Sequence, residues 1–125
     1  MPAPQCILIV DDNALTLLTL TRILEQHGYC VLGANSAGSG LQLVQHQPVD
    51  LVVMDYHLPD GDIELGPALK QMRPELPVVV FSGDPEAAQA AAFADLLLPK
   101  PQEPERLVAE IRRLLRGGRD RKSVV

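Results

Sequence analysis

The chain has 125 residues, enough for one domain that buries about two thirds of its unfolded surface. Of these residues 46% are hydrophobic and only 3% aromatic, so aliphatic side chains must fill the core. The formal net charge of -5 argues against direct nucleic-acid binding, because affinity for the phosphate backbone needs a basic surface. No apolar stretch reaches the roughly 20 residues of a membrane span. The first apolar run stops at two aspartates, unlike a signal peptide, so we expect a soluble, cytoplasmic protein.

Short β-type runs alternate with helical patterns, which is typical of βαβ units and a parallel sheet. The first strand is expected at about Cys6–Val10 and the first helix at about Asn13–His27, where Gly28 should stop it. The later expected elements are a strand at Tyr29–Ala34, a helix from an N-cap at Ser36 to about Gln45, a strand at Leu51–Met54, a helix at about Glu64–Met72, a strand at Val78–Phe81, a short Ala-rich helix at Pro85–Phe93, a strand at Leu96–Leu98 and a helix at about Glu103–Arg116.

The sequence also indicates where the domain ends and what state its cysteines are in. Gly117-Gly118 should end the last helix, which makes 1–118 the domain and 119–125 a polar, flexible tail. The two cysteines, Cys6 and Cys30, form no metal-binding or redox-type motif. Neighbouring strands would permit a bridge between them, but we expect free buried thiols in a reducing compartment.

Polar and charged residues follow the ends of four expected strands. Asp11-Asp12 closes the first run and Asp55 closes the third, while the last two runs end in Ser82 and, across Pro99, in Lys100. In a parallel sheet the carboxyl ends of all strands share one edge, and ligands bind there. Carboxylates, a hydroxyl and an ammonium should therefore converge. Such a set suits a divalent cation and a phosphoryl group.

The carboxylates predict a Mg²⁺ site, because this ion prefers hard oxygen ligands in near-octahedral geometry. Asp12 and Asp55 are the expected direct ligands, Asp11 binds directly or through water, and the carbonyl of His57 is within reach. Crowding three acids is unfavourable without such a cation.

The remaining groups predict phosphoryl transfer. Asp55 is central, and a free carboxylate is a competent nucleophile toward phosphorus. Lys100 would supply a positive charge, Ser82 a hydroxyl donor and Gly83 the room for the phosphoryl group.

Four segments together resemble the response-regulator receiver domains of two-component signalling, the CheY-like superfamily. They are Ile7-Leu-Ile-Val-Asp-Asp-Asn13, Val53-Met-Asp-Tyr-His-Leu-Pro-Asp60, Phe81-Ser-Gly83 and Leu98-Pro-Lys-Pro101. The resemblance covers about Gln5 to Arg116, and four blocks in the right order are highly specific.

The resemblance implies a single doubly wound, flavodoxin-like α/β fold: a five-stranded parallel sheet in the order 2-1-3-4-5 with helices on both faces. It implies Mg²⁺ at Asp11, Asp12, Asp55 and the carbonyl of His57. It also implies phosphorylation of Asp55, with Ser82 and Lys100 holding the phosphoryl group, and a cis Lys100–Pro101 bond.

The sequence also departs from the family pattern. Leu97 stands where the family usually has an aromatic switch residue, and the chain between Ser82 and Lys100 is several residues shorter than usual. The helix at 85–93 should therefore be short or distorted. The family's Met-Asp-Gly after the loop proline is reduced to Gly61-Asp62-Ile63. The phosphoryl chemistry looks intact, while the usual output route is altered.

We therefore expect a receiver domain that takes a phosphoryl group from a histidine kinase or phosphotransfer protein onto Asp55, with Mg²⁺, and then hydrolyses it slowly. It would signal through a downstream protein partner, a fused output domain or self-association as a homodimer. The main alternative is a receiver-fold interaction module that acts without phosphorylation. A haloacid-dehalogenase-like phosphohydrolase is less favoured, because that family has Asp-x-Asp after the first strand and here the aspartates are adjacent.

Overall fold

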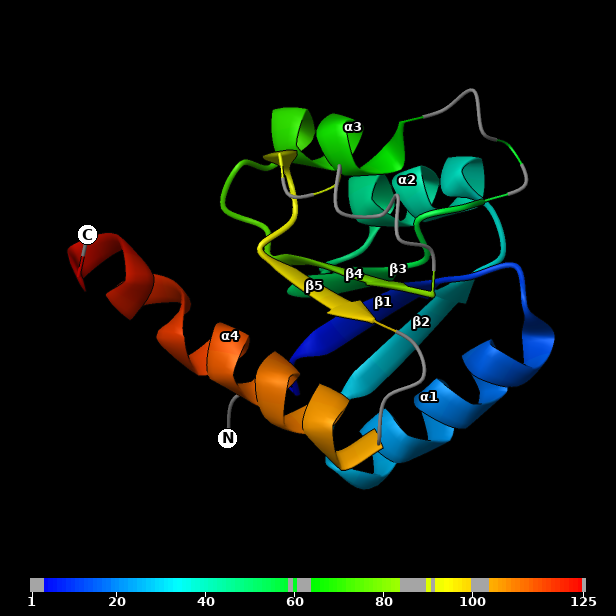
Figure 1. Ribbon diagram of the computed structural model, residues 1–125, viewed down its shortest axis with the longest axis horizontal. Coiled ribbons are helices and arrows are strands. Elements are labelled where there is room, and N and C mark those ends of the chain that lie inside the picture. Colours follow the sequence, from blue (N-terminus) through cyan, green and yellow to red (C-terminus); the bar gives the residue numbers. More distant parts are fainter. Residues whose placement is uncertain are drawn as a thin grey trace.

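In the computed structural model, five parallel strands form one sheet in the order β2-β1-β3-β4-β5. The strands are β1 (Cys6–Val10), β2 (Cys30–Ala34), β3 (Leu51–Met54), β4 (Val78–Ser82) and β5 (Leu96–Pro99), and the helices are α1 (Ala14–Gln26), α2 (Ala37–His46), α3 (Leu65–Met72) and α4 (Pro104–Val124). The structure describes residues 4–58, 60, 64–83, 90, 92–99 and 104–124, with the backbone alone at 104 and 117–124. Helices α2 and α3 cover one face and α1 and α4 the other (Figure 1). The predicted doubly wound fold is confirmed.

The three central strands are buried along their whole length and are apolar except for Ser82 at the end of β4, because both of their faces are covered. Successive side chains of a strand point to opposite faces. In β1, Leu8 and Val10 therefore join the core under α2 and α3, whereas Ile7 and Ile9 join the core under α1 and α4. The continuous apolar runs thus determine both cores, and each run ends where the polar residues of the candidate site begin.

Local signals at the helix ends act as the sequence predicts. Asn13 caps α1 and Ser36 caps α2, each accepting the N–H of the residue three positions on, at 3.0 and 3.2 Å. Gly28 adopts a φ of 91°, which favours glycine and lets the chain turn after α1. Gly40 has a packing reason, because a Cβ there would lie 2.9 Å from the Val10 side chain. The predicted cap at Ser36 and stop at Gly28 are therefore confirmed, whereas Asn13, predicted only as the start of the first helix, proves to be its cap.

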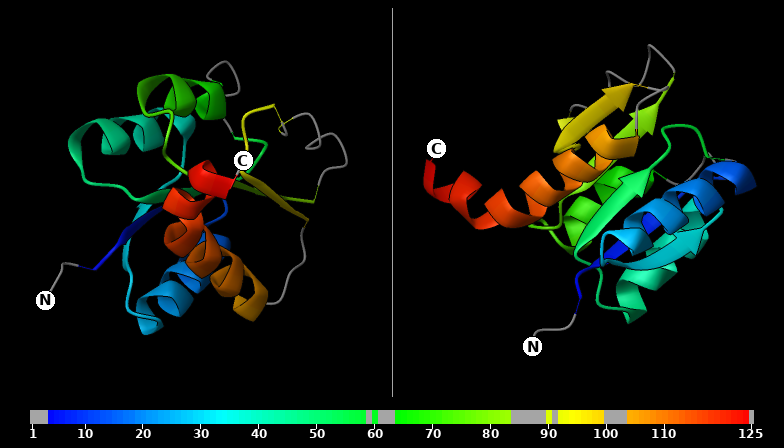
Figure 2. Two further views of the ribbon diagram at one scale, coloured as in Figure 1. Left: turned by 90° about the vertical axis from the view of Figure 1, so that its left-hand side faces the viewer. Right: turned by 90° about the horizontal axis from the view of Figure 1, so that it is seen from below.

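The last helix is longer than predicted. It runs through Gly117-Gly118 to Val124, so the prediction that these glycines end it is wrong. Glycine ends a helix readily when its φ is positive, and among the described residues Gly28 is the one glycine with such a φ. A glycine inside a helix costs only about 1 kcal/mol relative to alanine. Figure 2 shows α4 extending beyond the sheet. That residues 119–125 form a flexible tail stays a prediction.

The helix predicted at 85–93 lies largely outside the described residues. Its end is described, and there the N–H groups of Phe93 and Ala94 both donate to the carbonyl of Ala90, at 3.0 and 2.8 Å. Both bonds lie just before β5. The predicted loop departure at Gly61-Asp62-Ile63 also lies outside the described residues.

Candidate functional site

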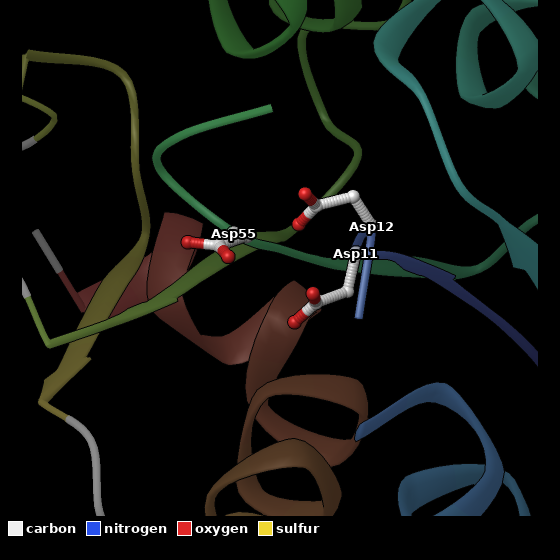
Figure 3. A group of neighbouring side chains, drawn as sticks. All are labelled: Asp11, Asp12 and Asp55. Carbon is white, nitrogen blue, oxygen red and sulfur yellow. The ribbon is translucent and has the colours of Figure 1, made fainter. Parts of the chain in front are cut away.

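Three aspartates meet at the carboxyl edge of the sheet. Val10 at the end of β1 is paired in register with Met54 at the end of β3, so the residues that follow the two strands emerge side by side. One carboxylate oxygen from each of Asp11, Asp12 and Asp55 lies within 4.8 Å of the others (Figure 3). We refer to these three residues as the aspartate cluster. The structure thus brings together the three acids that the sequence singled out as metal ligands.

The backbone of the aspartate cluster is held by the sheet itself. The N–H of Asp11 donates to the carbonyl of Ala34 in β2 at 3.0 Å, and the N–H of Asp55 donates to that of Val10 at 2.9 Å. Asp11 is only 3% exposed, Asp55 is half-buried and Asp12 is exposed. The cluster therefore has a rigid base with one side open to solvent.

Short-range hydrogen bonds orient two of the carboxylates. Oδ1 of Asp11 accepts the N–H of Asn13 at 2.9 Å, and Oδ1 of Asp55 accepts that of His57 at a longer 3.4 Å. Both are bonds to the residue two positions on, the local pattern that aspartate favours in turns. The exposed ring of His57 stands edge-on to Tyr56, with ring centroids 4.8 Å apart. These bonds fix the loops that carry the acids.

The electrostatics of the cluster favour a cation. At 4.8 Å, each pair of like charges repels by about 1 to 3 kcal/mol at effective dielectric constants between water and a protein surface. In a Mg²⁺ octahedron opposite ligands are about 4.2 Å apart, given metal–oxygen distances of about 2.1 Å. Adjacent ligands of such an octahedron are only about 3.0 Å apart, so the oxygens of the cluster need to move inward by up to about 1 Å each, or to bind through water, in order to share one ion. The donor set fits Mg²⁺ in chemistry and in size.

The remaining predicted residues divide between described and undescribed parts of the chain. Ser82 ends β4, is only 7% exposed and is paired in register with Pro99 at the end of β5. Since β3 and β4 are neighbours, Ser82 and Asp55 lie at the same edge. His57 follows β3, as described above. Lys100 lies outside the described residues, as does Pro101.

The comparisons with known proteins agree with this geometry. The sequence pattern of the response regulator receiver domain matches residues 7–112, which include the whole aspartate cluster and both cores up to Ile111. The chain belongs to this family. Membership of the family establishes the role of a receiver in two-component signalling. Among the described residues, no helix is both long and apolar enough to cross a membrane.

In individual curated relatives the matching receiver region is one part of a longer protein. Response regulator MprA of a Mycobacterium species (strain KMS) is 34% identical over 118 residues, covering 90% of this chain and 51% of MprA. The DNA-binding transcriptional regulator NtrC of a Bradyrhizobium species is 32% identical over 128 residues, covering 98% of this chain and 26% of NtrC. This chain therefore spans about half the length, or less, of these curated relatives.

A solved structure supports the fold directly. The CheY-like receiver domain protein of Methanospirillum hungatei JF-1 is 31% identical and superposes with a TM-score of 0.87, covering 94% of this chain and 98% of that one. The receiver fold is therefore shared over almost the whole chain.

Sequence reasoning missed the role of Asp60. Its Oδ1 and Oδ2 accept the N–H groups of Ala37 and Gly38, both at 2.9 Å, at the N-terminus of α2. These two bonds hold the pKa of Asp60 below its usual range, and the bond from Gly38 has the larger effect. Ser36 already gave a sufficient local cap signal, and nothing local links a residue 22 or 23 positions away to that helix. Asp60 fastens the loop after the candidate site to α2.

Proposed function

We propose that this receiver domain accepts a phosphoryl group on Asp55 in a Mg²⁺-dependent reaction and signals by altered protein contacts. The donor would be a histidine kinase or a phosphotransfer protein. The observation that carries the proposal is the aspartate cluster: three carboxylates within 4.8 Å, from the ends of two paired strands, in a member of the receiver family. Packing gives a fold no reason to gather acids in this way, whereas a phosphoryl-transfer site needs them to hold its metal ion and to supply the nucleophile.

Mg²⁺ would be held by oxygens of Asp11, Asp12 and Asp55 and by the carbonyl of His57. Its charge would neutralise the phosphoryl oxygens. The protein's part is to hold its ligands ready, and the sheet hydrogen bonds to Asp11 and Asp55 do this before any ligand arrives.

Asp55 would act as the nucleophile. One of its carboxylate oxygens bonds to phosphorus while the phosphorus–nitrogen bond to the donor histidine breaks, and the leaving imidazole takes a proton from solvent. Charge builds up on the phosphoryl oxygens, and fixed groups stabilise it without having to reorganise. The buried Ser82 hydroxyl would donate to one oxygen, and the ammonium of Lys100 would offset the charge on another. Slow attack by water on the phospho-aspartate would then reset the domain.

The output of the signal is proposed from the length of the relatives. MprA and NtrC extend well beyond the part matched here, so a fused output domain or a separate protein partner would receive the signal. Self-association as a homodimer is a further route.

One observation supports a second candidate function, an interaction module that works without phosphorylation. Position 97, where the family usually has an aromatic residue, holds Leu97, which packs against the core under α2 and α3. A receiver without that switch residue could keep a binding surface and lose phosphate control of it. The family match favours either receiver reading over the phosphohydrolase alternative.

The direct test is mass spectrometry of the intact chain after treatment with acetyl phosphate. We expect the addition of one phosphoryl group in Mg²⁺ buffer, far less in EDTA, and fragmentation that assigns the group to Asp55. Modification at another residue, or to the same extent in EDTA, would contradict the proposal. A partner pulled down equally by treated and untreated protein would support the interaction module instead.

A further inference from the structure

Two thiols face each other at the amino edge of the sheet, away from the aspartate cluster. Cys6 and Cys30 are paired in register at the starts of β1 and β2, and their Sγ atoms are 3.3 Å apart. Both are free, as expected, but only Cys6 is buried; the expectation that both would be buried is wrong, because Cys30 begins an edge strand and is exposed. A reagent in solution can therefore reach one sulfur of the pair.

The backbone on both sides of the pair is fixed. The N–H of Cys30 donates to the carbonyl of Gln5 at 2.9 Å. Cys6 is tied to Asp50 in both directions: its N–H donates to Oδ2 at 2.7 Å, and its carbonyl accepts the N–H of Asp50 at 2.8 Å. Neighbouring strands are about 4.8 Å apart, which lies within the Cα separations of disulfides. The backbone separation is therefore compatible with a disulfide, for which the two sulfurs have to close from 3.3 Å to about 2.05 Å.

The two thiols differ in reactivity. Burial, then the thiol of Cys30 and the charge of Asp50, raise the pKa of Cys6 to about 12, so Cys6 stays protonated at neutral pH. The exposed Cys30 is the sulfur that meets a reagent first. Cys6 stands directly behind it as the resolving thiol.

We propose that Cys6 and Cys30 form a redox-active dithiol, which low-molecular-weight disulfides such as oxidised glutathione convert reversibly into an intramolecular disulfide between β1 and β2. The Cys30 thiolate attacks one sulfur of the oxidant, whose S–S bond breaks and releases one glutathione thiolate. Cys6 then gives its proton to solvent, its thiolate attacks the sulfur of Cys30, and the second glutathione thiolate leaves. The protein loses two electrons and two protons, and the oxidant becomes two thiols.

The disulfide would link the edge strand β2 to the strand that carries Asp11 and Asp12. It closes a loop with a sequence separation of 24, which removes conformational freedom from the unfolded chain. For a domain of this size we expect the melting temperature to rise by about 10 °C. The aspartate cluster lies at the opposite end of β1, so phosphoryl acceptance should change by less than about twofold, since the core strand between them is already rigid.

The test uses the full chain, reduced and then incubated in buffers of defined ratios of reduced to oxidised glutathione. Trapped thiols are alkylated, and the protein is cut with trypsin, which cleaves after Arg22 between the two cysteines. We expect one linked pair of peptides containing Cys6 and Cys30, no glutathione adduct at equilibrium, and the higher melting temperature. Dithiothreitol should reverse both the peptide link and the rise in melting temperature.

Two variants serve as controls. Cys30→Ser should lose the oxidation and the temperature shift together, with Cys6 protected from alkylation. Cys6→Ala, which avoids a buried hydroxyl, should leave Cys30 as a stable glutathione adduct with no temperature rise. The proposal is overturned if the wild type accumulates that adduct, if it forms dimers through Cys30, or if both cysteines remain reduced throughout the series.

Discussion

The two edges of the sheet use carboxylates in opposite ways. At the amino edge, Asp50 accepts the N–H of Cys6 at the start of β1 at 2.7 Å, and Asp95 accepts that of Val78 at the start of β4 at 2.8 Å. Each of these acids satisfies a backbone group where a strand begins. At the carboxyl edge the aspartate cluster gathers its acids within 4.8 Å of one another. The first arrangement is stabilising as it stands, whereas the second becomes favourable when a cation binds.

This contrast separates structural from functional acids by what each carboxylate faces. An acid that meets an N–H group or an ammonium lowers the energy of the fold. An acid that lies close to other acids raises it, even where, like Asp11 and Asp55, it also accepts a backbone N–H, and sites that bind metals or transfer groups are where folds tolerate that cost. Substitutions of individual acids test the contrast.

The largest effect should come from comparing two single variants, each with one acid replaced at one edge of the sheet. Asp55→Asn removes the nucleophile, so phosphorylation by acetyl phosphate with Mg²⁺ should fall by on the order of 100-fold or more. Asp50→Asn, matched in chemistry but at the other edge, should keep the wild-type rate within about twofold. Rates are measured by intact-mass spectrometry over time. Equal rates in the two variants would remove the distinction between the edges.

At the amino edge the main effect should be on stability. Asp95 binds Lys70 Nζ at 2.6 Å as well as the N–H of Val78, and the two charged side chains are only 14% and 21% exposed. Asp95→Ala should lower the free energy of unfolding by about 2 to 3 kcal/mol, because the N–H of Val78 loses its acceptor and the Lys70 ammonium loses its carboxylate and keeps only the carbonyl of Leu76.

The control for this prediction is a solvent-exposed pair. Glu110→Ala breaks the contact with Arg113 on α4 at 3.1 Å, where the arginine is 58% exposed, and should cost at most about 0.5 kcal/mol. Urea denaturation measures both variants. A cost for Asp95→Ala as small as that for Glu110→Ala would show that the amino-edge acid adds nothing.

Removing one charge from the aspartate cluster should act with opposite signs with and without metal. Asp12→Asn should weaken Mg²⁺ binding by about tenfold, which is about 1.4 kcal/mol, and so reduce the rise in melting temperature on adding Mg²⁺. In EDTA the same variant should melt a few degrees higher than wild type, because one repulsive charge is gone. Thermal denaturation in the two buffers checks both signs. A lower melting temperature in EDTA would mean that the three acids do not repel one another.

The smallest effect should be a pH dependence at Asp60. The pKa of this carboxyl is lowered in the folded protein by the N–H groups of Gly38 and Ala37. Its stabilising effect is therefore fully present above the unfolded pKa of about 4 and is lost as the pH falls through the lower folded-state pKa. Asp60→Asn should melt slightly below wild type at neutral pH, with the difference shrinking toward zero in acid. A gap that persists or widens in acid would contradict this reading.

Features encoded by contiguous residues were predictable from the sequence. β3 is found at the predicted Leu51–Met54, since an apolar run between two aspartates has clear ends. Ser36 could be named as a cap because capping acts over three residues. The gathering of acids also followed from sequence, because the order of parallel strands places their carboxyl ends together.

Features that depend on distant contacts were not predictable. The bonds from Ala37 and Gly38 to Asp60 join parts of the chain more than 20 residues apart. The thiol pair depends on register, which sets Cys6 opposite Cys30 and could not be read from either strand alone. The end of α4 was missed for another reason: glycine is a weak stop signal unless the chain turns there, and α4 continues through both glycines.

The double hydrogen bond of Asp60 has a mechanical consequence. The loop that follows Asp55 is bonded through Asp60 to the first turn of α2, so a movement of the loop is transmitted to that helix. A displacement of the loop when a bulky group attaches to Asp55 would pull on the start of α2. In a chain with leucine at position 97, these two hydrogen bonds give α2 a direct mechanical connection to the nucleophile.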